Sequence, residues 1–589
     1  MIIKSKGSIM KISFSLLLVY LLLFSLFCDK QPVAAEIETD IIYTPHEAIE
    51  QMMRGINLGN TLEPDTEGGW NNGPVQEYYF DDYQSAGFQC VRIPVKWGSH
   101  TSESSPFDIN LSWLNRVEEV VDWGLERGLF IIINGHHEGW LKDDYSLLNI
   151  TRYENIWTQI SERFKDKSHR LLFEMINEPH GLTDEQTNDL NFRILPIIRE
   201  TNPTRIVIFS GSGWSSLNDM MNAAIPDDDY LMAYFHAYDP WNFGGLGNGI
   251  WGSSADRNAI SSMFEQAANW SATHNIPVMI SEFGAVHACD YNSRMLHYFT
   301  YVEEALKNNI AFQAWDDGGM FGIYNRNSRT WPEVKNILLD TSPMSPVELE
   351  STLLENGTVQ LSWQNSTSEN ISTIVERKTL DTDFLQIAVL SFDATTFEDT
   401  EVQSGSYFYY RILSELSDQS AAYSYPILAS NYSPPTERAN FLGEPFQIPG
   451  IIQAEDFDIG GEGWTYHDND DANITGAYRP FEGVDIEVRN DGGYQIAYIE
   501  TGEWVEYTIQ VTESRMYEIT IYTASMNSGG QLRFQIATSF SGFVDITASN
   551  SWQDLNSVTT SMYLHEGESF LRLHFMADQP FNLDRFVIQ

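Results

Sequence analysis

Eight short apolar runs recur in the first half of the chain, separated by longer stretches that mix polar and apolar residues. Each run has the length of a buried β-strand, and each interval leaves room for a helix. In the intervals 113–126 and 153–164 the apolar residues recur near helical spacing. The predicted strands are residues 55–60, 90–95, 130–134, 171–176, 206–210, 231–235, 277–280 and 311–315.

This alternation predicts an α/β fold with parallel strands. A count of eight within residues 43–340 favours a closed (β/α)8 TIM barrel, and an open doubly wound sheet is the alternative. Residues at the carboxyl ends of different barrel strands converge on one face. Candidate functional side chains are therefore expected at these strand ends.

The second half of the chain consists of short alternating runs bounded by turn residues. The stretch 341–346 and the stretch Ser433–Pro434–Pro435 are linker-like, which predicts two all-β sandwich domains, 347–430 and 446–589. The first of them, with Trp363 early and a Tyr-rich run at 407–412, resembles a fibronectin type III sandwich. Its expected role is that of a spacer.

Residues 1–35 have the pattern of a secretory signal peptide. Three lysines precede an apolar run at 12–27, which is shorter than the roughly 20 residues that a spanning helix needs. Residues 33–35 resemble a cleavage site. Lipid attachment at Cys28 is an alternative that Phe27 disfavours, because a small residue is usual there. We expect a secreted protein, either extracellular or at the cell surface or periplasm.

Composition narrows the class of partner. The 34 basic and 82 acidic residues give a formal charge of −48, which disfavours nucleic acid and other polyanions. After removal of residues 1–35, only Cys90 and Cys289 remain, so no disulfide framework is expected and both thiols are predicted to be unpaired.

Two glutamates stand at the ends of predicted strands, Glu178 in the run 173–179 and Glu282 in the run 278–284. Cleavage of a glycosidic bond needs one carboxyl group to protonate the leaving oxygen and a second to attack or stabilise an oxocarbenium-like centre. The fourth and seventh strands of a barrel would bring both to one face. A retaining mechanism requires the two carboxyl groups to lie about 5–5.5 Å apart.

These residues and their neighbours resemble glycoside hydrolase family 5 over about 43–340. Asn177–Glu178–Pro179 resembles the acid/base motif of the family, and Glu282 resembles its nucleophile. The resemblance implies a retaining barrel that needs no cofactor for catalysis. The other residues that it assigns to the substrate site are Arg92, His136, His137, Asn177, His236, Tyr238 and Trp315.

Each of these residue types has a chemical reason to be there. Arg92 is expected to keep Glu282 ionised, while a negative neighbour raises the pKa of Glu178 and keeps it protonated. Taken singly, a strand-end carboxylate is more often solvated or salt-bridged, and a Trp is more often part of the core. The pair His136–His137 also suggests zinc, but no carboxylate or third histidine follows at metalloprotease spacing.

The last region, about 446–589, resembles carbohydrate-binding module family 6 through the runs 452–457, 502–507 and 582–584. The resemblance implies a β-sandwich with a structural calcium held by Gln453, Glu455 and Asp584, oxygen ligands that suit a hard cation. It also implies a sugar-binding cleft that contains Tyr494, Trp552 and Asn582.

The sequence therefore predicts a secreted retaining endo-β-1,4-glucanase that binds neutral β-linked polysaccharide. Another β-linked backbone, such as mannan, xyloglucan, xylan or mixed-linkage glucan, is the alternative within the same class. A non-catalytic polysaccharide-binding protein is the alternative from a different class, although the presence of both glutamates disfavours it.

Overall fold

The computed structural model describes residues 41–589, except 355–356, 380–381, 403–406, 431–437, 470–472, 474, 481 and 578. The expected signal peptide and Cys28 lie outside the described residues. Within the described part of the chain, no helix combines the length and the apolar character needed to cross a membrane.

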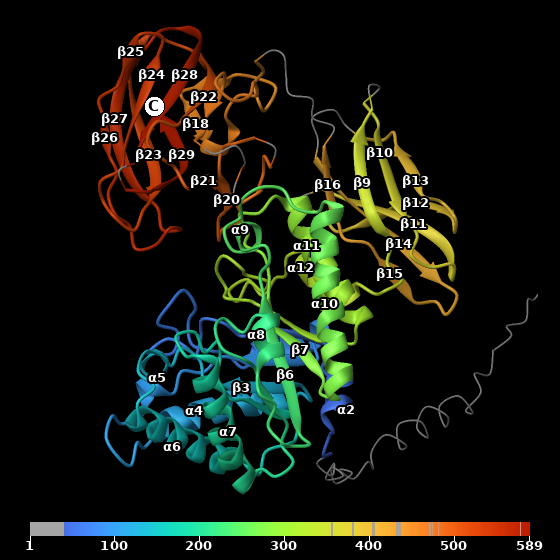
Figure 1. The fold of residues 1–589 in the computed structure, drawn as a ribbon. Coiled ribbons are helices and arrows are strands. Elements are labelled where there is room, and N and C mark those ends of the chain that lie inside the picture. Colours follow the sequence, from blue (N-terminus) through green and yellow to red (C-terminus); the bar gives the residue numbers. More distant parts are fainter. Residues whose placement is uncertain are drawn as a thin grey trace, which may run out of the picture. The chain divides into compact units, whose positions relative to one another are not determined.

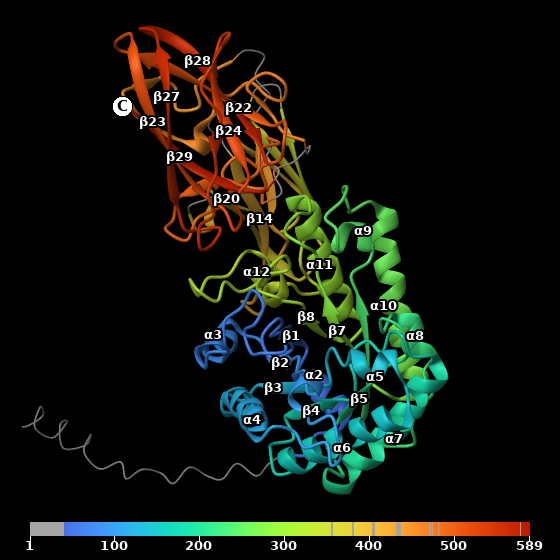
Figure 2. The same ribbon diagram turned by 90° about the vertical axis from the view of Figure 1, so that its left-hand side faces the viewer.

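Eight parallel strands form a closed barrel in sequence order, and β1 pairs with both β2 and β8. Closure confirms the predicted TIM barrel and excludes the open doubly wound sheet. Figures 1 and 2 show helices surrounding these strands. The strands are β1 Arg54–Asn57, β2 Cys90–Ile93, β3 Phe130–Asn134, β4 Leu171–Glu174, β5 Val207–Phe209, β6 Leu231–Ala237, β7 Val278–Phe283 and β8 Ala311–Ala314.

The barrel helices begin where the sequence supplies caps. Thr183 and Gln186 form a capping box at the start of α7, and Ser253 and Asp256 form another at the start of α10. The described helices of this region are α2 Pro45–Gln51, α3 Tyr78–Ala86, α4 Leu111–Glu126, α5 Gly139–Asp143, α6 Leu147–Phe164, α7 Asp184–Thr201, α8 Leu217–Asn222, α9 Trp241–Gly244, α10 Ser254–His274, α11 Tyr291–Lys307 and α12 Val334–Asp340.

Two strand ends differ from the prediction in a way that bears on the site. Strand β4 ends at Glu174, so Glu178 lies in the loop that follows. Strand β7 continues to Phe283 and therefore contains Glu282. The apolar run 171–176 outlasts β4: Met175 and Ile176 are buried, and side chains from α6, Tyr153 and Trp157, donate to the carbonyl oxygen of Met175.

Residues 347–430 contain two antiparallel sheets, and the buried rings of Trp363 and Tyr410 lie in their core. One sheet has the order β13-β10-β9 and the other the order β12-β11-β14-β15, with β16 paired to β14. The strands are β9 Val347–Leu353, β10 Val359–Gln364, β11 Asn370–Lys378, β12 Leu385–Ser391, β13 Thr396–Asp399, β14 Tyr407–Leu416, β15 Ala421–Tyr423 and β16 Ile427–Ser430.

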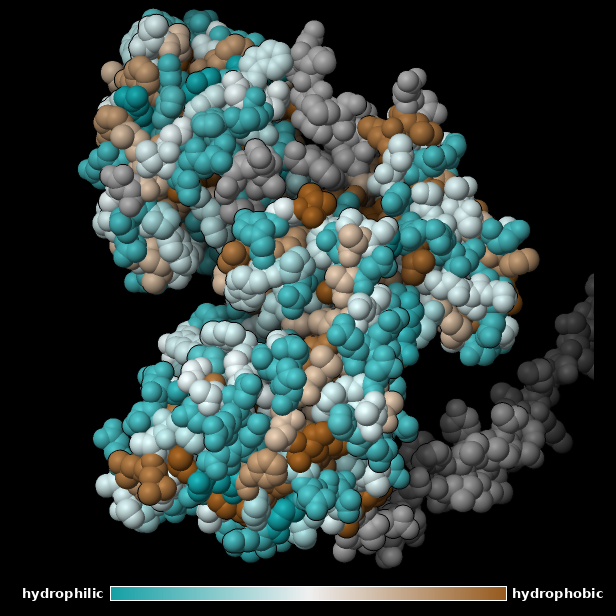
Figure 3. Space-filling model, viewed as in Figure 1, coloured by the Kyte–Doolittle hydropathy of each residue, from teal (hydrophilic) through white to brown (hydrophobic). Residues whose placement is uncertain are grey.

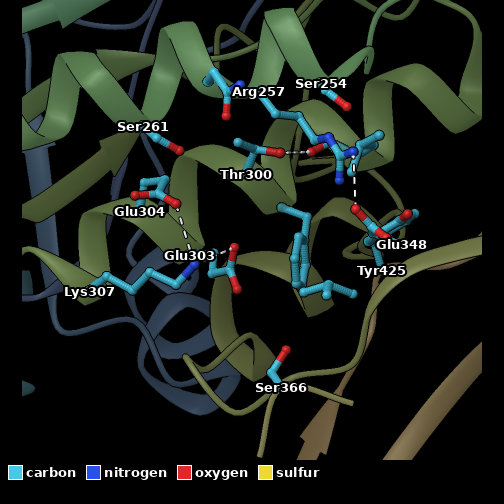
Figure 4. A pocket seen from close by; sticks show the side chains of 14 residues that line it. Ser254, Arg257, Ser261, Thr300, Glu303, Glu304, Lys307, Glu348, Ser366 and Tyr425 are labelled. Carbon is cyan, nitrogen blue, oxygen red and sulfur yellow. Dashed lines mark hydrogen bonds and ion pairs between the residues drawn. The ribbon is translucent and has the colours of Figure 1, made fainter. Parts of the chain in front are cut away.

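This second domain shares buried contacts with barrel helix α11. The ring of Phe299 lies 5.1 Å from that of Tyr425, and both belong to one hydrophobic core. The side chain of Asn292 makes two hydrogen bonds to the backbone of Leu428. Figure 4 shows the adjoining cavity of about 330 Å³, where Arg257 pairs with Glu348. The domain is therefore packed against the barrel, which a loose spacer would not be.

The last region forms two further sheets, β17-β22-β28-β24-β25 and β20-β21-β29-β23-β27, which are antiparallel apart from the β17–β22 pair. They enclose a separate hydrophobic core. The strands are β17 Phe446–Ile448, β18 Gly450–Gln453, β19 Tyr466–His467, β20 Ile486–Val488, β21 Tyr494–Ile496, β22 Trp504–Val511, β23 Arg515–Ala524, β24 Gln531–Ile536, β25 Ser539–Phe540, β26 Val544–Asp545, β27 Asn556–Leu564, β28 Gly567–Met576 and β29 Asn582–Ile588.

The hydropathy of the surface and the state of the cysteines agree with what the composition predicts. The face seen in Figure 3 is mostly hydrophilic, as a formal charge of −48 leads one to expect. Cys90 and Cys289 are free and buried, which confirms that both thiols are unpaired.

The contact between Asn292 and β16 can be tested by Asn292→Ala. Asn292 Nδ2 donates to Leu428 O at 3.0 Å, and Leu428 N donates to Asn292 Oδ1 at 2.6 Å. Loss of both bonds leaves a buried peptide group without its partner, which costs about 1–3 kcal/mol. We expect a lower melting temperature in calorimetry. The control Asn155→Ala loses one bond to its own helix and should change stability little; equal melting temperatures for Asn292→Ala and wild type would contradict the docked arrangement.

Candidate active site

Arg92, on β2, is the centre of the hydrogen-bond network at the carboxyl ends of the strands. Its side chain is fully buried and uses all five of its N–H donors. Nε and Nη2 donate to the two oxygens of Glu174 at 2.7 and 2.6 Å, and Nη2 also donates to Asn177 Oδ1 at 2.6 Å. Nη1 donates to Glu282 Oε1 at 2.7 Å and to Asn57 Oδ1 at 2.9 Å. One guanidinium thus joins four strand ends.

Asn57 and Glu174 were not predicted as site residues. Asn57 ends β1, and its Nδ2 donates to the carbonyl oxygens of Ser281 and Gln313 at 2.9 and 3.1 Å. Glu174 ends β4 and also accepts from Asn134 Nδ2 at 2.9 Å. Their positions at strand ends were the available signal, but each residue type alone is too common there to be singled out.

Glu178 and Glu282 face each other across the barrel end. One oxygen of each, together with a ring nitrogen of His236, lies within 4.8 Å of the other two ligand atoms. His236 Nδ1 is 2.8 Å from Glu178 Oε1 and 3.6 Å from Glu282 Oε2. Tyr238 donates to Glu282 Oε2 at 3.0 Å. The spacing matches a retaining pair and is too short for the 6.5–9.5 Å of inverting enzymes.

His236 is oriented by its second nitrogen. Since carboxylates only accept, Nδ1 carries the proton that faces them, and Nε2 accepts from Ser281 Oγ at 3.0 Å. Ser281 and Glu282 are neighbours on β7, so that strand holds the histidine as well as a carboxylate. Strands β6 and β7 thereby fix the relative position of the His236 ring and Glu282.

The loop that carries Glu178 is held by side chains from other elements. Tyr153 on α6 donates to Met175 O at 2.6 Å, and Tyr234 on β6 donates to Ile176 O at 2.7 Å. Glu178 N in turn donates to the Tyr234 hydroxyl at 3.2 Å. Glu178 has a φ of 37°, a left-handed conformation that is rare outside glycine and costs energy. These anchors maintain the conformation that turns Glu178 towards Glu282.

The electrostatics differ from the prediction. Burial raises the pKa of Glu282 more than His236 and Arg92 lower it. Burial also acts to raise the pKa of Glu178, but its hydrogen bond with His236 brings the pKa below the ordinary value. We had expected the opposite directions. The reason is that burial of Glu282 outweighs the nearby cation, while His236 lies closer to Glu178 than to Glu282.

Trp315 and His136 lie next to the carboxylates. Trp315 follows β8, and its ring is nearly parallel to that of His136, with centroids 6.2 Å apart and an interplanar angle of 6°. Burial holds the pKa of His136 well below its usual range, so its imidazole is neutral. His137 is exposed and makes an edge contact with Trp70 at 5.6 Å. The structure thus places His136 inside the site and His137 at its rim.

Glu63, in the loop after β1, also faces the two histidines. Its carboxylate and the rings of His136 and His137 place three ligand atoms within 4.8 Å. A zinc site at His136 and His137 would need such a carboxylate, and none follows these histidines at metalloprotease spacing in the sequence. However, Asn134 Nδ2 lies 3.1 Å from His136 Nδ1, so Nδ1 accepts a hydrogen bond and Nε2 carries the proton. With neither nitrogen free, His136 disfavours a metal ion at this position.

Burial raises the pKa of Glu63 to about 8. Its Oε1 accepts from Asn60 N at 2.7 Å, whereas Oε2 is buried without a hydrogen-bond partner. A protonated carboxyl group beside a neutral imidazole suits hydroxyl ligands, because the carboxyl group can donate and accept while His136 Nε2–H can donate. Glu63 therefore extends the polar part of the site.

Several aromatic side chains of the barrel loops are exposed. Trp70, Trp214 and Trp241 are 48%, 62% and 57% exposed, whereas Trp97 and Trp251 belong to the core. The ring of Trp214 stacks on His180, with centroids 4.0 Å apart. The exposed rings provide flat surfaces beyond the two carboxylates.

In the C-terminal region, the predicted Trp552 and Asn582 lie together. Asn582 Nδ2 donates to Glu487 Oε1 at 2.8 Å and to Trp552 O at 3.3 Å. The ring of the predicted Tyr494 packs at a tilt of 36° against that of Tyr478, with centroids 4.6 Å apart. Tyr498 is 54% exposed, and the charge of Glu487 helps to raise its pKa, after burial. Tyr498, two residues past the end of β21, is thus linked through Glu487 to Asn582 and is a second candidate for the ring that faces Trp552.

The three predicted calcium ligands differ in exposure and in their present partners. Gln453 is exposed, although its strand pairs with β29 beside Asp584. Asp584 forms ion pairs with Arg489 at 3.0 Å and with Arg585. Glu455 is buried with one oxygen lacking a partner, and burial, with the charges of Asp456 and Asp584, raises its pKa to about 8. Glu455 is therefore the member that most lacks a counter-charge.

Models of known protein families match both the barrel region and the C-terminal region. The family model described as cellulase (glycosyl hydrolase family 5) matches residues 51–319, and the model described as carbohydrate binding module (family 6) matches residues 477–589. Both matches agree with the resemblances seen in the sequence.

Three relatives are similar to the barrel half of the chain. Endoglucanase H of Acetivibrio thermocellus is 48% identical over 305 residues, which are 50% of this chain and 34% of that protein. Endoglucanase B of Clostridium cellulovorans is 32% identical over 331 residues, 49% of this chain and 74% of that protein. Endoglucanase A of Ruminococcus albus is 32% identical over 323 residues, 48% of this chain and 88% of that protein.

This chain spans only about a third of the length of Endoglucanase H. It spans most of the other two relatives, 74% of the one from Clostridium cellulovorans and 88% of the one from Ruminococcus albus. The chain belongs to glycoside hydrolase family 5.

Proposed function

We propose that this protein is an exported, retaining endo-β-1,4-glucanase whose C-terminal module binds polysaccharide. The observation that carries the proposal is the approach of Glu178 and Glu282 to within 4.8 Å, with Arg92 and Tyr238 bonded to Glu282. The similarity to three endoglucanases supports the substrate class. Export rests on the signal-like pattern of residues 1–35.

In the first step Glu282 attacks the anomeric carbon while Glu178 gives its proton to the leaving oxygen. Two carboxyl groups this close cannot both ionise freely, so they share one proton. The pKa directions favour that proton on Glu282 in the free site, and the reactive form is the one in which it has passed to Glu178. As the Glu282–sugar bond forms, the negative charge of Glu282 disappears. Tyr238 and Arg92 hold Glu282 at the angle of attack, so little reorganisation is needed.

In the second step Glu178 acts as a base and removes a proton from water, which attacks the sugar–Glu282 ester and releases the sugar with its configuration retained. His236 lies against both carboxylates and keeps Glu178 oriented through both steps. Asn177 has its oxygen committed to Arg92, so its amide N–H is the group available to a sugar hydroxyl.

Trp315 and His136 form the surface on which we expect the cleaved sugar to rest, with Glu63 as a partner for its hydroxyls. The exposed Trp70, Trp214 and Trp241 extend this surface to neighbouring sugars. Several exposed rings around the carboxylates suit contacts with more than one sugar of a long chain. Mannan, xyloglucan, xylan and mixed-linkage glucan remain alternative backbones, because loop contacts with individual hydroxyls decide among them.

For the C-terminal module, we propose a sugar site formed by Tyr498, Trp552 and Asn582. Binding to the polymer raises the local substrate concentration without changing the chemistry of the barrel. We further propose a structural calcium held by Gln453, Glu455 and Asp584. The buried, unpartnered oxygen of Glu455 supports this site, since a cation would remove the repulsion among neighbouring carboxylates.

The proposed activity predicts reducing-sugar release from carboxymethyl-cellulose, with the β-anomer formed first in NMR. Glu282→Gln should lower turnover at least about a thousandfold, since it removes the nucleophile, and should leave polymer binding largely intact. Activity on mannan but not on carboxymethyl-cellulose would overturn the glucanase assignment. Undiminished turnover by Glu282→Gln would overturn the nucleophile, and no turnover on any β-glycan would favour the non-catalytic alternative.

The module site predicts that Tyr498→Ala and Trp552→Ala weaken polysaccharide binding about tenfold or more, because each removes a stacking surface. Affinity electrophoresis in the Glu282→Gln background avoids degradation of the polymer. Tyr494→Ala is the matched control and should retain most of the affinity. The assignment is wrong if Tyr494→Ala is the variant that loses binding.

The calcium proposal predicts a higher melting temperature of the module in millimolar-range calcium than in chelator, because only the folded state offers the ligands. Glu455→Gln should abolish this calcium response. Identical melting curves of the wild type with calcium and with chelator would refute the site.

A further inference from the structure

Glu174 is the buried group whose role the proposed mechanism leaves open. It does not reach the two candidate carboxylates directly, yet it accepts two of the shortest bonds made by Arg92, at 2.6 and 2.7 Å. Both side chains have no exposed surface. A buried carboxylate is costly unless it is paired, so its position needs a reason beyond packing.

We propose that Glu174 is a positioning residue for glycoside hydrolysis, which neutralises Arg92 so that the Glu282 carboxylate remains a strong nucleophile. The proposal rests on the function proposed above. Glu174 touches neither sugar nor reacting atoms and acts through the Arg92 guanidinium.

The Arg92 guanidinium makes unequal contacts with its two acidic partners, Glu174 and Glu282. Glu174 binds Arg92 with both oxygens, in the bidentate form that is the stronger kind of pair, whereas Glu282 accepts one bond at 2.7 Å. The pair Arg92–Glu174 carries no net charge. Glu282 therefore receives a directed hydrogen bond, which orients it, without facing an unbalanced cation, which would make it a weaker base and nucleophile.

The surroundings keep Glu174 in this role. Asn134 Nδ2 donates to its Oε1 at 2.9 Å, and Arg92 donates one hydrogen bond to each oxygen. The other titratable groups near Glu174 are the buried phenols of Tyr153 and Tyr234, whose pKa values burial holds well above the usual range. They stay neutral at working pH and do not compete for its charge.

Six titratable or charged groups among the described residues surround Glu282. They are Arg92 from β2, Glu178 after β4 and His236 and Tyr238 from β6, with Glu63 and Lys142 at longer range. Of these groups, Arg92 is the one that Glu174 binds directly, through both of its carboxylate oxygens. A shift in the ionisation of Glu282 after such a change would therefore arise from Arg92.

Glu174→Gln removes the charge with little change in shape, and Glu174→Ala removes it while leaving space for water at the Arg92 donors. In both, Arg92 becomes an uncompensated cation beside Glu282. The acidic limb of the kcat/KM–pH profile, which reports the nucleophile of the free enzyme, should move to lower pH by about one unit or more. Turnover at the optimum should fall.

Glu174→Asp is the matched control, because it keeps the negative charge but shortens the reach. A merely structural role predicts lower activity in all three variants with the acidic limb unmoved, and that result would overturn the proposal. Carboxyl-carbon NMR titration of Glu282 in the wild type and both neutral variants gives a second readout that does not require turnover. If the wild type hydrolyses no β-glucan, the proposed function fails, while unchanged titration of Glu282 in the neutral variants refutes the role of Glu174.

Discussion

One buried cation organises the carboxyl end of this barrel. Arg92 uses every N–H that it has, and its partners come from β1, β4, β7 and the loop after β4. A lysine could not replace it, because a single ammonium lacks the planar fork that binds one carboxylate with two bonds and still reaches three other groups. The distance between Glu178 and Glu282 follows from this network, since Glu282 and Asn177 are both bonded to Arg92.

Closure of the barrel makes this network possible. Arg92 and Glu174 are 82 residues apart, and Arg92 and Glu282 are 190 residues apart. In a closed ring of eight parallel strands, all carboxyl ends face the same side, so side chains distant in sequence meet there. The interior excludes water, which strengthens each charged contact and also makes an unpaired charge costly. Complete pairing of Arg92 is therefore a condition of its burial.

The sequence predicted the barrel well because hydrophobic periodicity reports burial, and all eight strands were located. The prediction was less accurate where buried residues lie outside a strand. Met175 and Ile176 are apolar and buried but follow β4. Single strand-end residues such as Glu178, Glu282 and Arg92 could be recognised from motifs. Asn57, Glu63 and Glu174 could not, because their roles depend on partners from other strands. Likewise, the direction of the pKa shift of Glu282 depends first on its burial, which no local pattern reveals.

The central claim is that Glu282 forms a covalent bond to the sugar while Glu178 transfers protons. It is tested most directly by trapping the intermediate with a 2-deoxy-2-fluoro-β-cellobioside that has an activated leaving group, followed by digestion and peptide mass spectrometry. The label is expected on the peptide that contains Glu282, with one label per chain. Label on Glu178, or on a peptide that contains neither glutamate, would contradict the claim.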